Sequence, residues 1–378
     1  MVADDPLIYR QPPRPAARRV GQTAARLLVA IAAMLGIGGG RASAADDVVV
    51  EPAEPVSAIQ TNVIESLTPA EARKLLRDFV PGAQIEVDTG AACITRPHCL
   101  HLNALTSLDA ETAAVLAKYR RGIMLGGLTS LDADTARALT SQGTRPLHLF
   151  GLTTLDADTA AVLAASKGWD GTLPKLATLE PDVAAALAAF EGADLNLGGL
   201  TTISPETAAA LAKSQAANLH LYGMKTLSAA AARALAEFGG DKSMLLLPRL
   251  TEFDADIVTA LAESKGKVSL PVEALAERIG QGLPLTPATV RLLSASAGPG
   301  QEIAIPGVIA LHSPEAVEIA RALAATKATL SLPNLKRISP QALAMLVESP
   351  TASIVIPPRD VLEVTAGLDG SHDDVVSP

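Results

Sequence analysis

Apolar and polar positions follow a pattern that recurs about every 24 residues from Leu100 almost to the end of the chain. Each copy begins with a short apolar–polar alternation, which is typical of a strand, and continues with an apolar stripe of helical period. The shared pattern, L-x-L-x-G-L-T-x-L-(D/S)-x-(D/E)-T-A-x-x-L, therefore predicts a strand, a turn, a capped helix and a loop in each unit. The clearest copies are 123–146, 147–170 and 195–218.

Helix starts are marked by a short polar residue at one position of the unit, where its side chain accepts bonds from free amides of the first turn. Proline often follows, at a position where its missing N–H costs nothing. The predicted caps are Asp109, Asp132, Asp156, Ser204, Ser228, Asp254, Thr286, Ser313 and Ser339. Alanine recurs at one inward helical position, which brings the helices close to the strands.

A fixed period of this length predicts a stacked solenoid, in which each unit buries its apolar face against its neighbours. We expect an α/β solenoid of about eleven strand–helix repeats over 100–358, with one parallel sheet and one helical layer. A degenerate copy at 66–79 predicts an N-terminal capping segment, 63–99. Extra residues at 271–282 are expected to form a loop insertion in the array, and this insertion is one of two places where the distant enzyme alternative would have its chemistry.

The strand leucines and those that follow them, such as Leu195, Leu197 and Leu200, resemble the bacterial leucine-rich repeat family over 100–358. The family's usual turn asparagine is replaced by leucine, and N-capped helices replace its common convex segment. The chain is therefore similar to a divergent, alanine-rich member. The resemblance implies binding to another protein and no catalysis.

Residues 1–44 have the features of a signal peptide. Arginines precede an apolar run at 27–37, and Ala42-Ser43-Ala44 is a typical cleavage site. We expect an exported protein, periplasmic or secreted, with no membrane insertion after cleavage. An acidic linker is expected at 45–62 and a disordered tail at 359–378.

Charge narrows the classes of partner. Residues 1–44 carry six arginines and two aspartates, so removing them changes the net charge from −9 to −13. An acidic chain disfavours nucleic acids and anionic membranes as partners. The expectation of a protein partner comes from the resemblance, which implies no particular partner.

The two cysteines, Cys93 and Cys99, lie just before the first full unit. In an oxidising compartment such neighbours pair, so a disulfide is expected. A metal site formed with His98 and His101 is the alternative, although the spacing matches no established zinc pattern, and free thiols are a third reading. No metal and no cofactor are expected. The single Asp88-Thr89-Gly90 signature lacks the second copy that an aspartic protease needs, and we interpret it as a turn.

Histidines recur between the strand leucines, where alternation places them on the open face of the sheet. They would be about 10 Å or more apart, too far to share a metal. Aromatic residues follow two of them, and exposed aromatics are typical anchors of interfaces. The predicted partner-binding residues on this face are His148, Phe150, Thr172, Asn196, His220 and Tyr222.

These features together predict a non-catalytic scaffold that binds a protein along its sheet face. A secreted effector or surface adhesin acting on a host is the alternative. An enzyme or metal-binding protein that uses segment 88–101 is a more distant one.

Overall fold

The computed structural model describes residues 61–79, 99–143, 145–240, 242–297, 301–326, 328–348, 354–358 and 360–365. The chain divides into two compact units, Met1–Pro55 and Val56–Pro378, and every described residue belongs to the second. The expected signal peptide, most of the expected linker and Cys93 lie outside the described residues.

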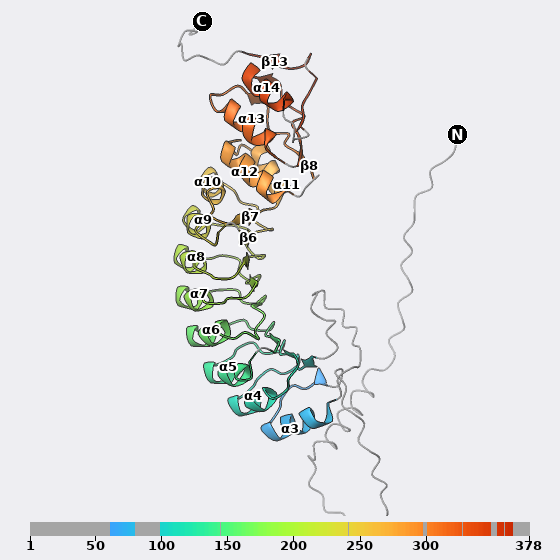
Figure 1. The fold of residues 1–378 in the computed structure, drawn as a ribbon, viewed down its shortest axis with the longest axis vertical. Helices are drawn as coiled ribbons and strands as arrows, with labels where there is room; N and C mark the ends of the chain where they lie inside the picture. Colours follow the sequence, from blue (N-terminus) through green and yellow to red (C-terminus); the bar gives the residue numbers. More distant parts are fainter. Residues whose placement is uncertain are drawn as a thin grey trace, which may run out of the picture. The chain divides into compact units, whose positions relative to one another are not determined.

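Short helices and very short strands alternate along the described chain (Figure 1). The helices are α3 (Pro69–Asp78), α4 (Ala110–Leu116), α5 (Ala133–Thr140), α6 (Ala157–Ala164), α7 (Pro181–Leu187), α8 (Pro205–Leu211), α9 (Ala229–Ala236), α10 (Ala255–Ala262), α11 (Val272–Gly280), α12 (Pro287–Ser296), α13 (Ala316–Ala324) and α14 (Pro340–Val347). The strands are β1 (Leu100–His101), β2 (Ile123–Met124), β3 (Leu147–His148), β4 (Asp194–Asn196), β5 (Asn218–His220), β6 (Met244–Leu246), β7 (Lys267–Ser269), β8 (Glu302–Ala304), β9 (Ala310–Leu311), β10 (Thr329–Ser331), β11 (Arg337–Ile338), β12 (Ile354–Val355) and β13 (Glu363–Val364).

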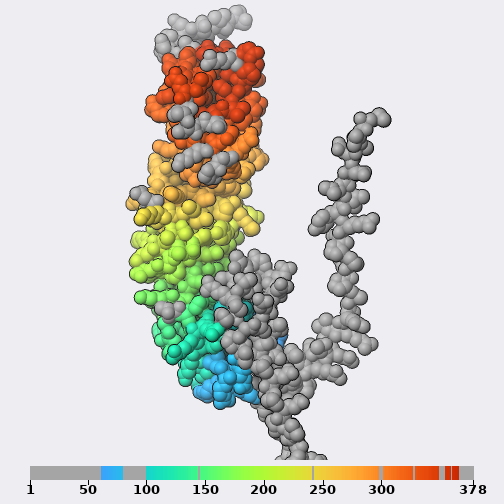
Figure 2. Space-filling model, turned by 45° about the vertical axis from the view of Figure 1, so that its right-hand side comes forward, coloured from blue at the N-terminus to red at the C-terminus, as the bar shows by residue number. Residues whose placement is uncertain are grey.

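The units stack in chain order, as a solenoid requires. From α3 to α10 each helix packs against the next, and the strands lie together on one side of the helices (Figure 1). The same order is visible on the surface, where the colours of successive units follow one another (Figure 2). All strand pairs in the ladders are parallel, which confirms an α/β repeat architecture.

The expected single sheet is divided. The described strands form ladders β1-β2-β3, β4-β5-β6-β7 and β12-β10-β8, and an additional ladder, β13-β11-β9, that the sequence pattern did not predict. Between β3 and β4 only isolated bridges remain, Leu147 to Trp169 and Thr172 to Asn196.

Helix starts agree with the predicted caps in most units. Asp109, Asp132, Asp156 and Asp254 each accept a hydrogen bond from the backbone N–H three residues ahead, at 2.7–2.8 Å. In α13 the structure differs: Glu315 is the N-cap without a side-chain bond, so this helix starts two residues after the position that Ser313 predicts.

A threonine at the third helical position ties successive units together. The Thr159 hydroxyl donates to the Leu131 carbonyl at 3.2 Å, and the Thr207 hydroxyl to the Leu179 carbonyl at 3.0 Å, both 28 residues earlier in sequence. Because these hydroxyls are buried, each bond satisfies a carbonyl that has no access to water.

The core lies between the strand layer and the helix layer. The apolar residues on either side of the outward strand residue are buried there, and so is the recurrent inward alanine of the helix. The inward alanines are Ala113, Ala136, Ala160, Ala184, Ala208 and Ala232, each 0% exposed. At these positions a larger side chain would separate the layers.

The insertion at 271–282 is a helix, not the expected loop. α11 buries Val272, Leu275, Ala276 and Ile279, a helical stripe that periodicity could have detected. It follows β7 directly and interrupts the ladder of the sheet. After β7, the Leu270 N–H donates to the Ser296 hydroxyl at 3.0 Å instead of to another strand.

The tail expected from residue 359 contains ordered residues. β13 pairs with β11 in parallel, with Arg337 opposite Glu363 and Ile338 opposite Val364. Leu362 is buried in the core cluster. The disordered tail predicted for 359–378 is therefore wrong at Leu362, which is buried, and at Glu363 and Val364, which continue the ladder.

Candidate protein-binding face

The predicted face consists of the strand residues that point away from the helices. In the β4–β7 ladder, Asn196 pairs with His220, which pairs with Leu246, and a bridge joins Thr172 to Asn196. Thr172, Asn196 and His220 therefore lie side by side in one row across successive strands. Each of the three is half-buried. Backbone pairing holds this row in place.

His220 is at the centre of a polar network on this row. Its Nε2 donates to Asp194 Oδ1 at 2.9 Å, and its Nδ1 is hydrogen-bonded to the Tyr222 hydroxyl at 2.5 Å. Asn218 Nδ2 donates to the same Asp194 oxygen at 2.8 Å. The bonds from Asn218 and His220 lower the pKa of Asp194 and keep its carboxylate charged, although burial opposes this.

The His220 network is accessible to a partner. The Asp194 side chain is 52% exposed, whereas that of His220 is 14% exposed. The rings of His220 and Tyr222 meet edge to face, with centroids 5.1 Å apart. The network thus fixes an aromatic ring and presents a carboxylate, a combination suited to protein recognition.

His148 does not belong to this row, and its expected exposure is wrong. It is 2% exposed, and His101, at the same position of another unit, is 6% exposed. In register His148 lies opposite Met124, which lies opposite His101. Alternation assigned the correct face, but this part of the face is covered, so His148 cannot contact a partner from solvent.

A buried ion pair holds His148. Its Nδ1 donates to Asp170 Oδ2 at 2.6 Å, and the Thr172 N–H donates to Asp170 Oδ1 at 3.1 Å. Burial alone would lower the pKa of His148. The bond to Asp170 and the nearby Cys99 thiol outweigh that effect and raise the pKa to about 9.

Phe150 packs beside His148, with ring centroids 5.4 Å apart, and is half-buried. Of the six predicted residues, the structure therefore buries His148 and leaves the other five half-buried, namely Phe150, Thr172, Asn196, His220 and Tyr222. The prediction omitted Asp170, Asp194 and Asn218. The position of Asp194 and Asn218, two residues before Asn196 and His220 in their strands, could have identified them, because side chains two apart share a face.

Cys99 is buried and has a free thiol in the structure. Its expected disulfide partner Cys93 and the alternative ligand His98 lie outside the described residues, so the pairing stays a prediction. Within the described ranges, no group of three or more His, Cys, Asp or Glu side chains is arranged to hold a metal ion. None of the helices in those ranges is both long and apolar enough to cross a membrane.

No protein-family model and no curated protein matches the chain. Among solved structures, the chain is similar to one described as the crystal structure of the Rad7 and Elc1 complex in yeast. The sequence identity is 14%, the match covers 70% of this chain and 77% of that chain, and the TM-score is 0.33. A likeness at this level carries no argument about function.

Proposed function

We propose that the protein is an exported, non-catalytic repeat scaffold that binds another protein along its sheet face. The binding site is the accessible row Thr172, Asn196 and His220, together with Tyr222 and Asp194. The His220 network is the observation that supports this placement. It is a group of polar and aromatic side chains held by one another on paired strands.

Such a site needs little reordering on binding. The hydrogen bonds of His220 fix the side chains of Asp194 and Tyr222 before a partner arrives, which reduces the entropy lost on association. Tyr222 supplies apolar contact area with a hydroxyl at its end, and Asp194 supplies charge that selects a basic group on the partner. The acidic net charge of the chain agrees with a basic patch on the partner.

Photo-crosslinking tests the placement. A photoreactive residue replaces Asn196 in the mature chain, and one replaces the exposed Lys213 on the helix side as the matched control. We expect one dominant crosslinked protein from the Asn196 position, identified by mass spectrometry, and none shared with the Lys213 position. Equal crosslinking of the same protein from both positions would contradict a binding site on the sheet face.

Two substitutions separate the contributions of Tyr222. Tyr222→Phe removes the hydroxyl that bonds to His220 but keeps the ring, whereas Tyr222→Ala removes both. We expect the Ala variant to lose most of the crosslink and the Phe variant to keep part of it. Circular dichroism of each variant establishes that the fold is retained.

Export is tested separately. We expect cell fractionation to find the protein outside the cytoplasm, with an N-terminus at Ala45. A full-length chain in the cytoplasm would contradict export without affecting the binding site. Recovery from the culture medium or cell surface with no partner from the same cells would instead favour the effector or adhesin alternative.

A further inference from the structure

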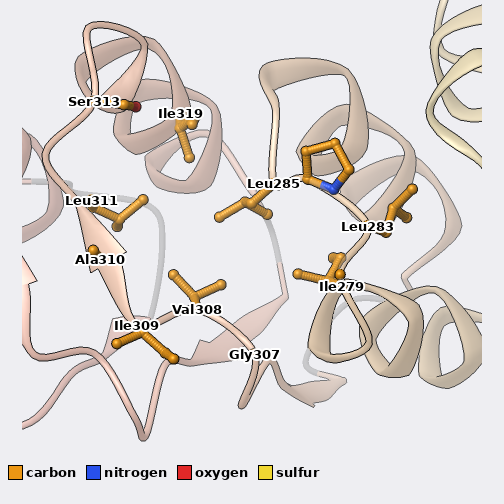
Figure 3. Close-up of a pocket in the computed structure, with 12 residues that line it drawn as sticks. Ile279, Leu283, Leu285, Gly307, Val308, Ile309, Ala310, Leu311, Ser313 and Ile319 are labelled. Carbon is orange, nitrogen blue, oxygen red and sulfur yellow. The ribbon is translucent and has the colours of Figure 1, made fainter.

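An apolar groove lies between the end of the insertion helix α11 and strand β9 (Figure 3). Its volume is about 350 Å³, and none of the described residues that line it is charged. Leu283 and Leu285 lie on one side and Val308 and Leu311 on the other. Ile309 at its rim is 56% exposed, which is unusual for a large apolar side chain in this chain.

β9 is an edge strand that faces this groove. On its other side, the Ile309 and Leu311 carbonyls accept bonds from β11, from Arg337 at 3.3 Å and Ser339 at 2.9 Å. In a parallel pair with Ala310 opposite Arg337, this pattern directs the N–H and C=O of Ala310 away from β11. No described strand pairs with β9 on that side.

Open edges of this kind accept an added strand, whose side chains then alternate into and out of the neighbouring groove. The strands of this ladder, β9, β11 and β13, have two residues each, so a two-residue addition matches its size. The groove has room for a branched apolar side chain and has no group to pair with a charged one.

The C-terminal segment of the chain has the required residues and reach. β13 is the third strand of the same ladder, and thirteen residues, 366–378, follow Thr365. Thirteen extended residues span up to ~43 Å, whereas the free side of β9 is three strand spacings, or ~14 Å, from β13. The segment contains Val375-Val376, and valine favours strands.

The charges of the C-terminal segment complement a charge beside the groove. Asp373 and Asp374 precede the two valines. Lys336, whose N–H donates to the Ile309 carbonyl at 2.8 Å, is exposed beside the rim of the groove. We propose that Val375-Val376 of this chain adds to the free edge of β9 as an extra strand, with one valine in the groove.

Hydrogen–deuterium exchange of the full chain tests this proposal. The variant Val375→Asp/Val376→Asp removes the apolar contact, and Val375→Ile/Val376→Ile is the matched control. We expect the backbone of 307–313 to exchange about tenfold faster in the Asp variant and at the wild-type rate in the Ile control. Peptides from β4–β7 report whether the fold is intact. Identical exchange of 307–313 in all three proteins would overturn the proposal.

A disulfide trap identifies the occupant. Ala310→Cys and Val375→Cys are combined in a chain that also carries Cys93→Ser and Cys99→Ser. We expect oxidation to produce a crosslinked monomer. A crosslink found only between two chains would place the segment of a second copy in the groove and overturn the proposal as stated, as would the absence of any crosslink.

Discussion

The imidazole of His148 lies 2.6 Å from the carboxylate of Asp170, a residue 22 positions later in sequence. The His148 side chain is 3% exposed and that of Asp170 is 24% exposed. Because the pair is largely shielded from water, solvent weakens its attraction less than that of a surface pair. The pair joins β3, at the start of the unit 147–170, to the last residue of that unit on the sheet face.

This pair makes stability depend on pH. Because the pKa of His148 is raised to about 9 in the folded chain, above the ordinary value of 6.5, its contribution is fully present below about pH 6.5. It is lost as the pH rises through about 9. The shift in the pKa of His148 corresponds to on the order of 3 kcal/mol of folding stability. Urea unfolding at several pH values measures it.

The variant Asp170→Asn isolates the effect. Asp170→Asn removes the charged partner that raises the pKa of His148, while burial still lowers that pKa, so we expect the decline in stability between pH 6.5 and 9 to become much smaller. His220→Gln is the control, since His220 lies in the separate accessible network. An unchanged decline in Asp170→Asn would show that another group titrates.

Arg145 is the other buried charge with several partners. Its guanidinium donates to the Leu116 and Tyr119 carbonyls at 3.2 and 2.8 Å and also to those of Ala117 and Leu139. These carbonyls lie at the C-terminal ends of α4 and α5, where helices leave acceptors unsatisfied. We expect Arg145→Met to destabilise this region by about 3 kcal/mol, because it leaves several carbonyls without donors.

Hydrogen–deuterium exchange of the amides in 110–143 measures the loss of stability in this region alone. A local measurement is needed because the units of a solenoid unfold partly independently. The exposed Arg121→Met is the matched control and should change stability by less than about 0.5 kcal/mol. Similar effects of both substitutions would argue against a specific role of Arg145.

The threonine between units provides a further prediction. Thr159→Val keeps the shape of the side chain but removes the hydroxyl that bonds to the Leu131 carbonyl. We expect a loss of about 1–2 kcal/mol, because that carbonyl stays buried without its donor. Thr154→Val, at an exposed position of the same unit, should be nearly neutral in the same thermal unfolding measurement. Equal losses in the two variants would contradict a specific contribution of the bond to the Leu131 carbonyl.

Local features of the fold were predictable from the sequence because they depend on neighbouring residues. Asp132 and Asp156 cap helices through contacts three residues away, and the pattern identifies both. The helical spacing of the apolar residues in α11 also predicts this helix, but α11 stands where the other units have a loop, so the repeat pattern predicts a longer loop instead. The division of the sheet at Leu270 follows from that helix.

Features that depend on contacts between units were not predictable in the same way. Alternation places His148 on the open face but does not determine whether that part of the face is covered. The Asp170 partner depends on the register between β3 and the residues after Trp169, where a single bridge replaces a ladder. The pattern identifies His220 together with Tyr222, since they are two residues apart in sequence, but Asp194 comes from the neighbouring strand.

The recurrent glycine of the pattern, Gly151 in the unit 147–170, lies against the backbone of the preceding unit. A Cβ at Gly151 would lie 2.3 Å from the Gly126 carbonyl oxygen and 2.5 Å from that of Leu128, which are backbone atoms of the preceding unit. Backbone cannot move aside as a flexible side chain can, so Gly151→Ala must push the two units apart. We expect Gly151→Ala to lower the free energy of unfolding by at least about 1–3 kcal/mol, which is typical of overpacking. Gly240→Ala is the control, since no atom lies within 4 Å of its Cβ. Thermal unfolding of both variants measures the difference, and a Gly151→Ala variant as stable as the control would mean that the units are not in close backbone contact there.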